Sequence, residues 1–364
     1  MNVVVKIGTT SVTDLHGDID PGAVEKLCTE VSALRGHHHR VVVVSSGAIS
    51  AGLPALGLSG ARPTDLATLQ AVSAVGQHRL MRVYEDALSR HGLVAGQVLL
   101  APLDFVNRSQ YLHARQTLSR LLDLGVVPVV NENDAVADDE IRFGDNDRIA
   151  ALVAHLVSAD VLVLLTDTAG MFTSDPNLDS EASLIDEIVE VDAALKTATD
   201  SSGDARGSGG MASKLAAARM AAWSGVTAVI ASANRPGVLE AAIAGEAGVG
   251  TVVRPRDRRL TARKLWIAFA VGSSGRIVVD AGARNALVSS GRSLLPAGVV
   301  SAEGSFAVED AVEMCGPDGQ VFAKGLTRHA SSRVQEWAGK RSTDLPPDVA
   351  PVIVHRDDMV VLSA

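Results

Sequence analysis

The feature that most constrains the fold of this chain is the alternation of short apolar runs with longer helical patterns over about its first 250 residues. Each run is apolar throughout and rich in Val, Ile and Leu, which is typical of strands buried on both faces of a parallel sheet. The predicted strands are Val3–Val5, Val41–Val44, Val94–Leu99, Val126–Val130, Val161–Leu165 and Val226–Ala231. This pattern predicts an α/β fold, an open and mostly parallel sheet sandwiched by helices.

The first helix carries signals at both of its ends. Asp20 can cap its N-terminus, Pro21 suits its first turn, and Gly36 can end it. Apolar residues recur between these ends at helical spacing and include Cys28, which we therefore interpret as a core residue. Further helices are predicted at Leu66–Leu80, Gln110–Leu122, Arg148–Ser158 and Ala212–Trp223.

The sequence changes in character after residue 250. Residues 251–270 are rich in Arg and Lys around Pro255 and predict a solvated basic linker. Residues 271–364 contain short strands punctuated by glycines, which predicts a small β-rich domain separate from the α/β domain of residues 1–250. The predicted strands here are Gly275–Asp280, Leu294–Val299 and Ala311–Met314. A length of 364 residues also favours two domains.

Composition and charge exclude several classes of protein. The chain has 33 Lys and Arg against 42 Asp and Glu, a net charge of −9, and so lacks the overall basic character of a nucleic-acid binder. A local basic patch is compatible with that balance. Cys28 and Cys315 have no metal-ligand or redox spacing, and the sequence shows neither a signal peptide nor an apolar stretch of the ~20 residues that span a membrane. These features predict a cytoplasmic protein.

Polar, glycine-bearing segments follow the predicted strands, where parallel sheets bind ligands. Lys6, followed by Gly8, can bring an ammonium and backbone N–H groups to a phosphate, although a lysine at a strand end is more often simply exposed. Ser45-Ser46-Gly47-Ala48 can aim helix N–H groups at an anion, or can be an ordinary helix start.

Two clusters of acids and amides follow further along. Asn131-Glu132-Asn133-Asp134 comes directly after a predicted strand, and Gly144-Asp145-Asn146-Asp147 precedes a predicted helix. Both offer donors and acceptors for the ammonium and carboxylates of an amino acid, whereas the alternatives are a simple turn and a helix cap. Neither has the regular spacing of a calcium-binding loop.

The segment from Gly207 to Lys214 is a glycine-rich run that opens a predicted helix. It lacks the Gly-Lys-Ser/Thr core of a P-loop, because Lys214 follows Ser213 and precedes Leu215. A glycine loop at a helix N-terminus can nevertheless cradle phosphate groups.

Taken together and in order, these segments resemble the amino acid kinase family over essentially the whole chain. The β-rich C-terminal part resembles a PUA domain, a small module found in RNA-modifying enzymes. The segments that carry the resemblance are Val5–Thr9, Ser45–Ile49, Asn131–Val136, Gly144–Asp147, Leu165–Asp167, Gly209–Met211 with Lys214, and Val354–Met359.

The resemblance implies roles for individual residues. Lys6 and Lys214 would contact the ATP phosphates as catalytic residues, and Asp147 would hold the two lysines in place. The implied glutamate-binding residues are Ser46, Gly47, Asp134 and Asn146. The implied ATP-binding residues are Lys6, Gly8, Thr166, Asp167, Ser208, Gly209, Gly210, Met211, Ala212, Ser213 and Lys214.

The resemblance further implies transfer of the γ-phosphate of ATP, with Mg²⁺, to the side-chain carboxylate of L-glutamate, the first step of proline biosynthesis. It implies proline as a feedback inhibitor, a homodimer or homotetramer, and a glutamyl-phosphate reductase that takes the product. A glutamate carboxyl with a pKa of about 4.3 is already an anionic nucleophile at neutral pH. The reaction therefore needs positioning and charge stabilisation rather than a general base.

Two alternatives stay open at this point. A sibling kinase that acts on N-acetylglutamate, aspartate, carbamate or uridylate would share the sheet. An RNA-associated role through the PUA-like domain is favoured weakly by the basic linker and opposed by the acidic net charge.

Overall fold

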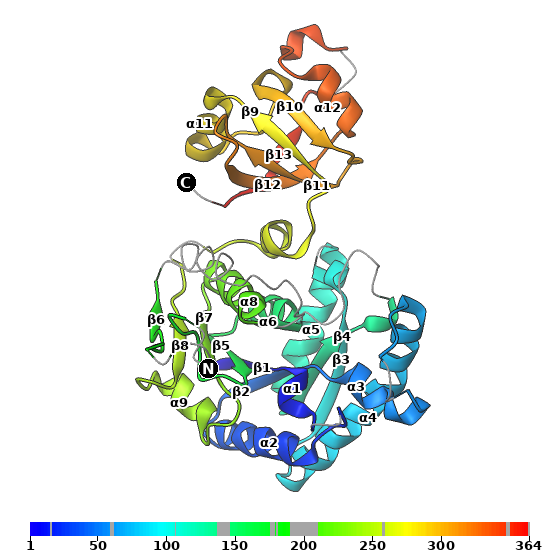
Figure 1. The fold of residues 1–364 in the computed structure, drawn as a ribbon, viewed down its shortest axis with the longest axis vertical. Coiled ribbons are helices and arrows are strands. Elements are labelled where there is room, and N and C mark those ends of the chain that lie inside the picture. The colour runs from blue at the N-terminus through cyan, green and yellow to red at the C-terminus, as the bar shows by residue number, and fades with distance from the viewer. Residues whose placement is uncertain are drawn as a thin grey trace. The chain divides into compact units, whose positions relative to one another are not determined.

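The computed structural model describes residues 1–14, 17–58, 62–105, 107–136, 146–174, 179, 181–189, 210–256, 259–346 and 350–362. The chain divides into two compact units, an N-terminal unit, Met1–Arg259, and a C-terminal unit, Leu260–Ala364 (Figure 1). Within the described ranges, no helix combines the length and the apolar character that crossing a bilayer requires.

The N-terminal unit is built on a sheet that has eight strands among the described residues, in the order β3-β4-β2-β1-β5-β7-β8-β6. All neighbouring pairs are parallel except β7 and β8, which confirms the predicted mostly parallel sheet. The strands are β1 Asn2–Ile7, β2 Arg40–Ser45, β3 Ala95–Leu100, β4 Val127–Glu132, β5 Val161–Thr166, β6 Glu187–Ile188, β7 Thr227–Ser232 and β8 Gly250–Val253.

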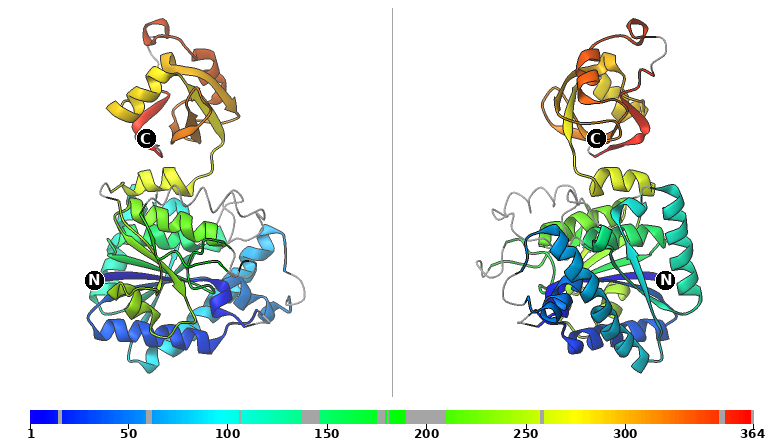
Figure 2. Two further views of the ribbon diagram at one scale, coloured as in Figure 1. Left: turned by 60° about the vertical axis from the view of Figure 1, so that its left-hand side comes forward. Right: turned by 90° about the vertical axis from the view of Figure 1, so that its right-hand side faces the viewer.

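Helices cover both faces of this sheet, with α2, α4 and α9 on one face and α5, α6 and α8 on the other (Figures 1 and 2). The helices are α1 Thr9–Val12, α2 Pro21–Gly36, α3 Ala48–Gly52, α4 Leu66–Arg90, α5 Arg108–Asp123, α6 Asn146–Leu156, α8 Met211–Trp223 and α9 Val238–Ala244. Short 3₁₀ turns lie at η1 Pro54–Leu56, η2 Pro102–Phe105 and η3 Asp134–Val136.

The helix ends follow local chemistry. The Asp20 side chain accepts a hydrogen bond from Gly22 N at 2.8 Å, and α2 runs from Pro21 to Gly36 as its capping signals predict. The predicted end of α4 at Leu80 is wrong, because the apolar face continues through buried Tyr84 and Leu88 and the helix ends only at Arg90.

Alternation along β1 decides which way its one charged side chain points. Val3, Val5 and Ile7 are buried in the core cluster that contains the apolar face of α2. Successive side chains of a strand point to opposite faces of the sheet. Lys6 therefore faces the other layer, the one that contains α6.

The C-terminal unit has a sheet of five strands among its described residues, in the order β10-β9-β11-β12-β13. Only β9 and β11 pair in parallel, so the predicted β-rich unit is mostly antiparallel. Its elements are α10 Ala262–Leu265, the π-helical turn η4 Trp266–Ala270, β9 Gly275–Val279, α11 Ala281–Ser290, η5 Pro296–Gly298, β10 Val299–Gly304, β11 Ala311–Cys315, β12 Val321–Thr327, α12 Ser331–Trp337, η6 Ser342–Asp344 and β13 Val354–Val361.

One predicted strand of this unit is wrong. Leu294 makes only an isolated bridge to Val354, and the chain then forms the 3₁₀ turn η5 before strand β10 begins at Val299. The cause is Pro296, which has no N–H to contribute to a ladder and has the fixed φ that suits the first position of a turn. The sheet of the N-terminal unit, in turn, extends through β8 to Val253.

Candidate active site

The centre of the candidate site is the carboxylate of Asp147, which is buried between two lysines. Lys6 Nζ lies 2.6 Å from its Oδ1, and Lys214 Nζ lies 3.4 Å from its Oδ2. The hydroxyl of Ser213 donates to Oδ2 at 2.7 Å. Asp147 is 1% exposed, Lys6 3% and Lys214 5%, so the three charges interact where water screens them little.

The surroundings keep Asp147 ionised. Burial by itself works to raise the pKa of Asp147, but the ammonium groups of Lys6 and Lys214, together with hydrogen bonds from Lys6 and Ser213, outweigh it and hold the pKa below its usual value. The three side chains Lys6, Lys214 and Asp147 thus carry a net positive charge, which suits a polyanionic ligand.

Three elements bring these groups together. Lys6 lies on the central strand β1, Asp147 in the first turn of α6, and Lys214 in the first turn of α8. Helix N-termini carry partial positive charge and unpaired N–H groups, which attract anions. The N-cap of α8 is Gly210, which makes no side-chain cap, so it leaves room for a ligand to approach that turn.

The nucleotide-binding residues that the sequence predicts lie partly at this centre. Met211, Ala212, Ser213 and Lys214 form the first turn of α8 after Gly210. A Cβ built on Gly8 would lie 3.5 Å from Lys6 Nζ, which places this glycine beside the ammonium. Ser208 and Gly209 lie outside the described residues, as do Gly144 and Asp145 of the acidic cluster.

Thr166 is the last residue of β5 and Asp167 follows it, at the same end of the parallel strands as Lys6. Ile7 of β1 pairs with Leu165 of β5, so the next residues of both strands leave the sheet side by side. Thr166 is buried and donates from Oγ1 to Asp167 Oδ1 at 2.9 Å, while the Asp167 side chain is exposed.

A second group of polar side chains lies one residue before Asp147 in the chain. Asn146 Nδ2 donates to Ser45 O at 2.9 Å, to Ser46 Oγ at 3.0 Å and to Asn131 Oδ1 at 2.7 Å. Asn131 Nδ2 in turn donates to Gln77 Oε1 at 2.6 Å. All of these side chains are buried. The predicted residues Ser46 and Asn146 are thus joined directly, next to the lysine pair.

Asp134 extends this polar group. It lies in η3, just after β4, and accepts a hydrogen bond on Oδ2 from the hydroxyl of Ser73. Burial raises the pKa of Asp134, and the bond from Ser73 only partly offsets that effect. A carboxylate in this state gains from a cationic partner such as an ammonium group.

Close backbone packing holds the loop that contains Ser46 and Gly47. Gly47 has a φ of 105°, a conformation that favours glycine, and leads into α3. Helix α3 packs against α4 at glycines, since a Cβ on Gly76 would lie 1.7 Å from Ala48 O and one on Gly52 would lie 2.0 Å from Val72 O. This contact fixes the distance between α4 and the start of α3.

Sequence reasoning missed two residues of the polar group, Ser73 and Gln77. Both lie on α4, four residues apart and therefore on one face of the helix. The signal that could have found them is that they share this face with buried Leu69, Val72 and Leu80. Polar side chains on the apolar face of a helix need buried partners.

The described residues contain no group of three or more His, Cys, Asp or Glu side chains placed to hold a metal ion. Mg²⁺ that is bound to a nucleotide triphosphate usually keeps waters and phosphate ligands and takes few protein ligands.

Comparisons with known proteins assign both parts of the chain to known families. Residues 1–232 match the amino acid kinase family, and residues 275–346 match the PUA domain. Glutamate 5-kinase from Pelobacter propionicus is 43% identical over 364 residues, which cover 99% of this chain and 97% of that protein. Glutamate 5-kinase from Geobacter sp. (strain M21) is 44% identical over 364 residues, with coverage of 99% and 97%.

Among solved structures, carbamate kinase from Giardia lamblia bound to AMP-PNP matches with a TM-score of 0.52 and 18% identity, over 70% of this chain and 98% of that one. Such a likeness bears on the fold alone. The family matches and the relatives, which extend over both units, identify the chain itself. It belongs to the amino acid kinase family, in its glutamate 5-kinase branch, and carries a C-terminal PUA domain.

Proposed function

We propose that this chain transfers the γ-phosphate of ATP to the side-chain carboxylate of L-glutamate, the first step of proline biosynthesis. The observation that carries the proposal is the buried arrangement of Lys6 and Lys214 on either side of Asp147. The names of the full-length relatives support the choice of L-glutamate as the acceptor.

In this reaction a γ-carboxylate oxygen attacks the γ-phosphorus of ATP, and the bond from that phosphorus to the oxygen bridging to the β-phosphate breaks. The products are γ-glutamyl phosphate and ADP. No proton has to be moved, because the carboxylate is ionised at neutral pH. The task of the protein is to align the two anions and to neutralise the charge between them.

Lys6 and Lys214 perform that neutralisation. Asp147 holds both ammonium groups at fixed positions, so they need no reorganisation when the phosphoryl group moves between donor and acceptor. The first-turn N–H groups of α8 bind phosphate oxygens, together with Gly8 and Gly210. Thr166 and Asp167, at the same sheet edge, contact the nucleotide, which binds as its magnesium complex.

Ser46, Gly47, Asp134 and Asn146 bind the glutamate. Asn146 and Asp147 are consecutive in the first turn of α6. The same helix end therefore positions both the glutamate substrate and the two lysines that Asp147 contacts. Proline inhibition, a homodimer or homotetramer and a glutamyl-phosphate reductase partner stay predictions of the family resemblance. A cytoplasmic location stays a prediction from the sequence.

The test is a hydroxamate assay with L-glutamate and MgATP on three purified proteins: wild type, Lys214→Ala and Lys214→Met. Methionine keeps most of the volume of this buried lysine, so it separates lost charge from lost packing. We expect both variants to lose roughly 10²- to 10³-fold in kcat, the usual effect of removing one charge contact to a transition state. Lys340→Ala, an exposed lysine of the C-terminal unit, is the matched control and should leave kcat unchanged.

Near-normal turnover in the Lys214 variants would refute the role of this lysine. Substituting N-acetylglutamate for glutamate tests the acceptor itself. If wild type phosphorylated N-acetylglutamate faster than glutamate, the assignment of the substrate would be wrong.

A further inference from the structure

The buried side-chain amides of Gln77, Asn131 and Asn146 form a hydrogen-bonded row. Their hydrogen bonds to backbone groups determine which atom of each amide is the nitrogen and which is the oxygen. Glu132 N donates to Asn131 Oδ1 at 2.9 Å, and a backbone N–H can only donate, so that atom is an oxygen. Asn131 Nδ2 is therefore the donor toward Gln77, and the receiving atom is Gln77 Oε1. Asn146 Nδ2 donates to Ser45 O, which can only accept. The hydrogen bonds thus assign the nitrogen and the oxygen of all three side-chain amides.

The residue at each end of this hydrogen-bonded row has one amide atom without a hydrogen-bond partner among the described residues. Gln77 Nε2 and Asn146 Oδ1 are both buried and have no hydrogen-bond partner among the residues that the structure describes. Their residues are only 7% and 3% exposed. Folded proteins rarely leave buried polar groups unpaired, so a spare donor and a spare acceptor in one network indicate a ligand that has both an acceptor and a donor.

The spare donor, Gln77 Nε2, belongs to a residue of helix α4. Ser73 and Gln77 lie one turn apart on it, and they contact Asp134 and Asn131 respectively. Gly76 lets the backbone of α4 approach Ala48 O, at the start of the helix that follows Ser46. This close packing holds the side-chain amide of Gln77 at the polar group that also contains Ser46, Asp134 and Asn146.

We propose that Gln77 is a specificity-determining residue that donates from Nε2 to the α-carboxylate of L-glutamate. This inference rests on the proposed function. Glutamate has three charged groups, and its γ-carboxylate must lie at the lysine pair, where the phosphoryl group arrives. Its ammonium needs acceptors, which Asn146 Oδ1 and the Asp134 carboxylate provide. The remaining α-carboxylate needs a donor, and Gln77 Nε2 is the spare one.

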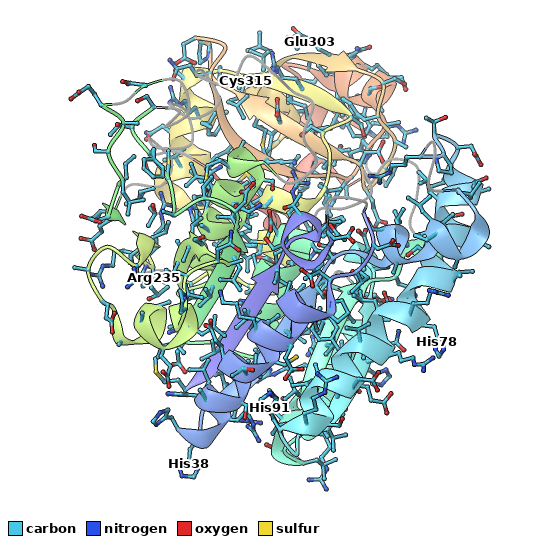
Figure 3. All side chains as sticks on the ribbon, turned by 60° about the horizontal axis from the view of Figure 1, so that its bottom comes forward. His38, His78, His91, Arg235, Glu303 and Cys315 are labelled. Atoms are coloured by element: carbon cyan, nitrogen blue, oxygen red, sulfur yellow. The ribbon has the colours of Figure 1, made fainter. Side chains whose placement is uncertain are left out.

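Two substitutions separate this role from a structural one. Gln77→Glu keeps the size of the side chain and an oxygen that accepts from Asn131 Nδ2, but it replaces the spare N–H by a carboxylate oxygen. Gln77→Ala removes both the bond to Asn131 and the spare donor. His78→Ala is the matched control, because His78 is exposed and its side chain points away from the body of the N-terminal unit (Figure 3).

KM for L-glutamate, KM for ATP and kcat are measured at about pH 8.5, well above the ordinary glutamate pKa of about 4.3. We expect Gln77→Ala to raise KM for glutamate roughly 10- to 100-fold, the effect of losing a hydrogen bond to a charged group. Gln77→Glu should raise it further, because a second anion then faces the α-carboxylate. Neither variant should change KM for ATP more than about twofold, and His78→Ala should match wild type.

A merely structural role predicts the opposite order, since Glu preserves packing and the bond to Asn131 while Ala loses both. A lower KM for glutamate in Gln77→Glu than in Gln77→Ala would overturn the inference, and so would an unchanged KM in both. These results differ from a failure of the proposed function, in which wild type itself would show no glutamate-dependent ADP release.

Discussion

Replacing Asp147 by Asn removes the anion between the two lysines while keeping the shape of the side chain. At the observed distances of 2.6 and 3.4 Å, the Coulomb attractions at an effective dielectric constant of about 20 are roughly 6 and roughly 5 kcal/mol before any cost of desolvation. The net loss is smaller, and breaking a buried ion pair from one side costs about 3–5 kcal/mol. Here the substitution leaves two buried ammonium groups facing one neutral amide.

The assay is thermal unfolding together with hydroxamate formation. For a unit the size of Met1–Arg259, each kcal/mol of lost stability lowers the unfolding midpoint by about 2–4 °C, so we expect a decrease of roughly 6–20 °C. Turnover should fall at least as far as in the Lys214 variants, since both lysines lose their fixed position.

A double variant sharpens the test. Adding Lys6→Met to Asp147→Asn removes one of the two ammonium groups that no longer face the Asp147 carboxylate. The double variant should therefore unfold at a higher temperature than Asp147→Asn alone, yet remain inactive. An Asp147→Asn protein that unfolds within about 2 °C of wild type and keeps its kcat would refute the reasoning. A double variant no more stable than the single one would show that charge repulsion is not the cause.

The same carboxylate links stability to pH. Because the folded-state pKa of Asp147 is lowered, its contribution is fully present above the unfolded-state value of about 3.9 and is lost as the pH falls toward the folded-state value. The difference in stability between wild type and Asp147→Asn should accordingly shrink in acid.

Two further predictions concern the acceptor half of the site. Gly76→Ala should destabilise the protein by about 1–3 kcal/mol and raise KM for glutamate, because its Cβ would lie 1.7 Å from Ala48 O. Gly36→Ala is the control, because a Cβ there would have no atom within 4 Å. Equal unfolding midpoints for the two variants would contradict the close packing at Gly76. KM for glutamate should rise as the pH is lowered from about 8 to about 5, since burial raises the pKa of Asp134 and its protonated form lacks the negative charge that attracts the ammonium group of the substrate. The rise should be absent in Asp134→Asn, and a rise of equal size there would assign the titration to another group.

The strands were predictable because strands covered on both faces leave continuous apolar runs in the sequence. Val41–Val44 and Val161–Leu165 could hardly be anything else, and both lie within observed strands. The sequence pattern alone does not predict that Lys6 and Lys214 lie close together, because they are far apart in the chain. Only the family resemblance indicated it, and the structure shows Asp147 between the two lysines.

The residues that sequence reasoning missed depend on contacts that no local pattern contains. Gln77 looks like an ordinary polar residue of a helix, and it is buried only because Asn131 lies at the end of a strand more than fifty residues further on. The predicted strand at Leu294 failed for a similar reason. Its apolar residues suit a strand, but the single proline after Leu295 decides the backbone there.

The central position of β1 has a consequence for how the chain is made. Val3, Val4 and Val5 have no exposed surface in the folded unit, because β2 pairs on one side of them and β5 on the other. During synthesis β2 emerges soon after β1, whereas β5 follows only about 150 residues later, which takes roughly 8–30 s at ordinary translation rates. For that interval the nascent chain has an apolar strand with an open edge, the kind of surface that invites pairing with other chains. The strand that positions Lys6 at the centre of the mature enzyme is thus a part of the growing chain that needs shielding until β5 has been made.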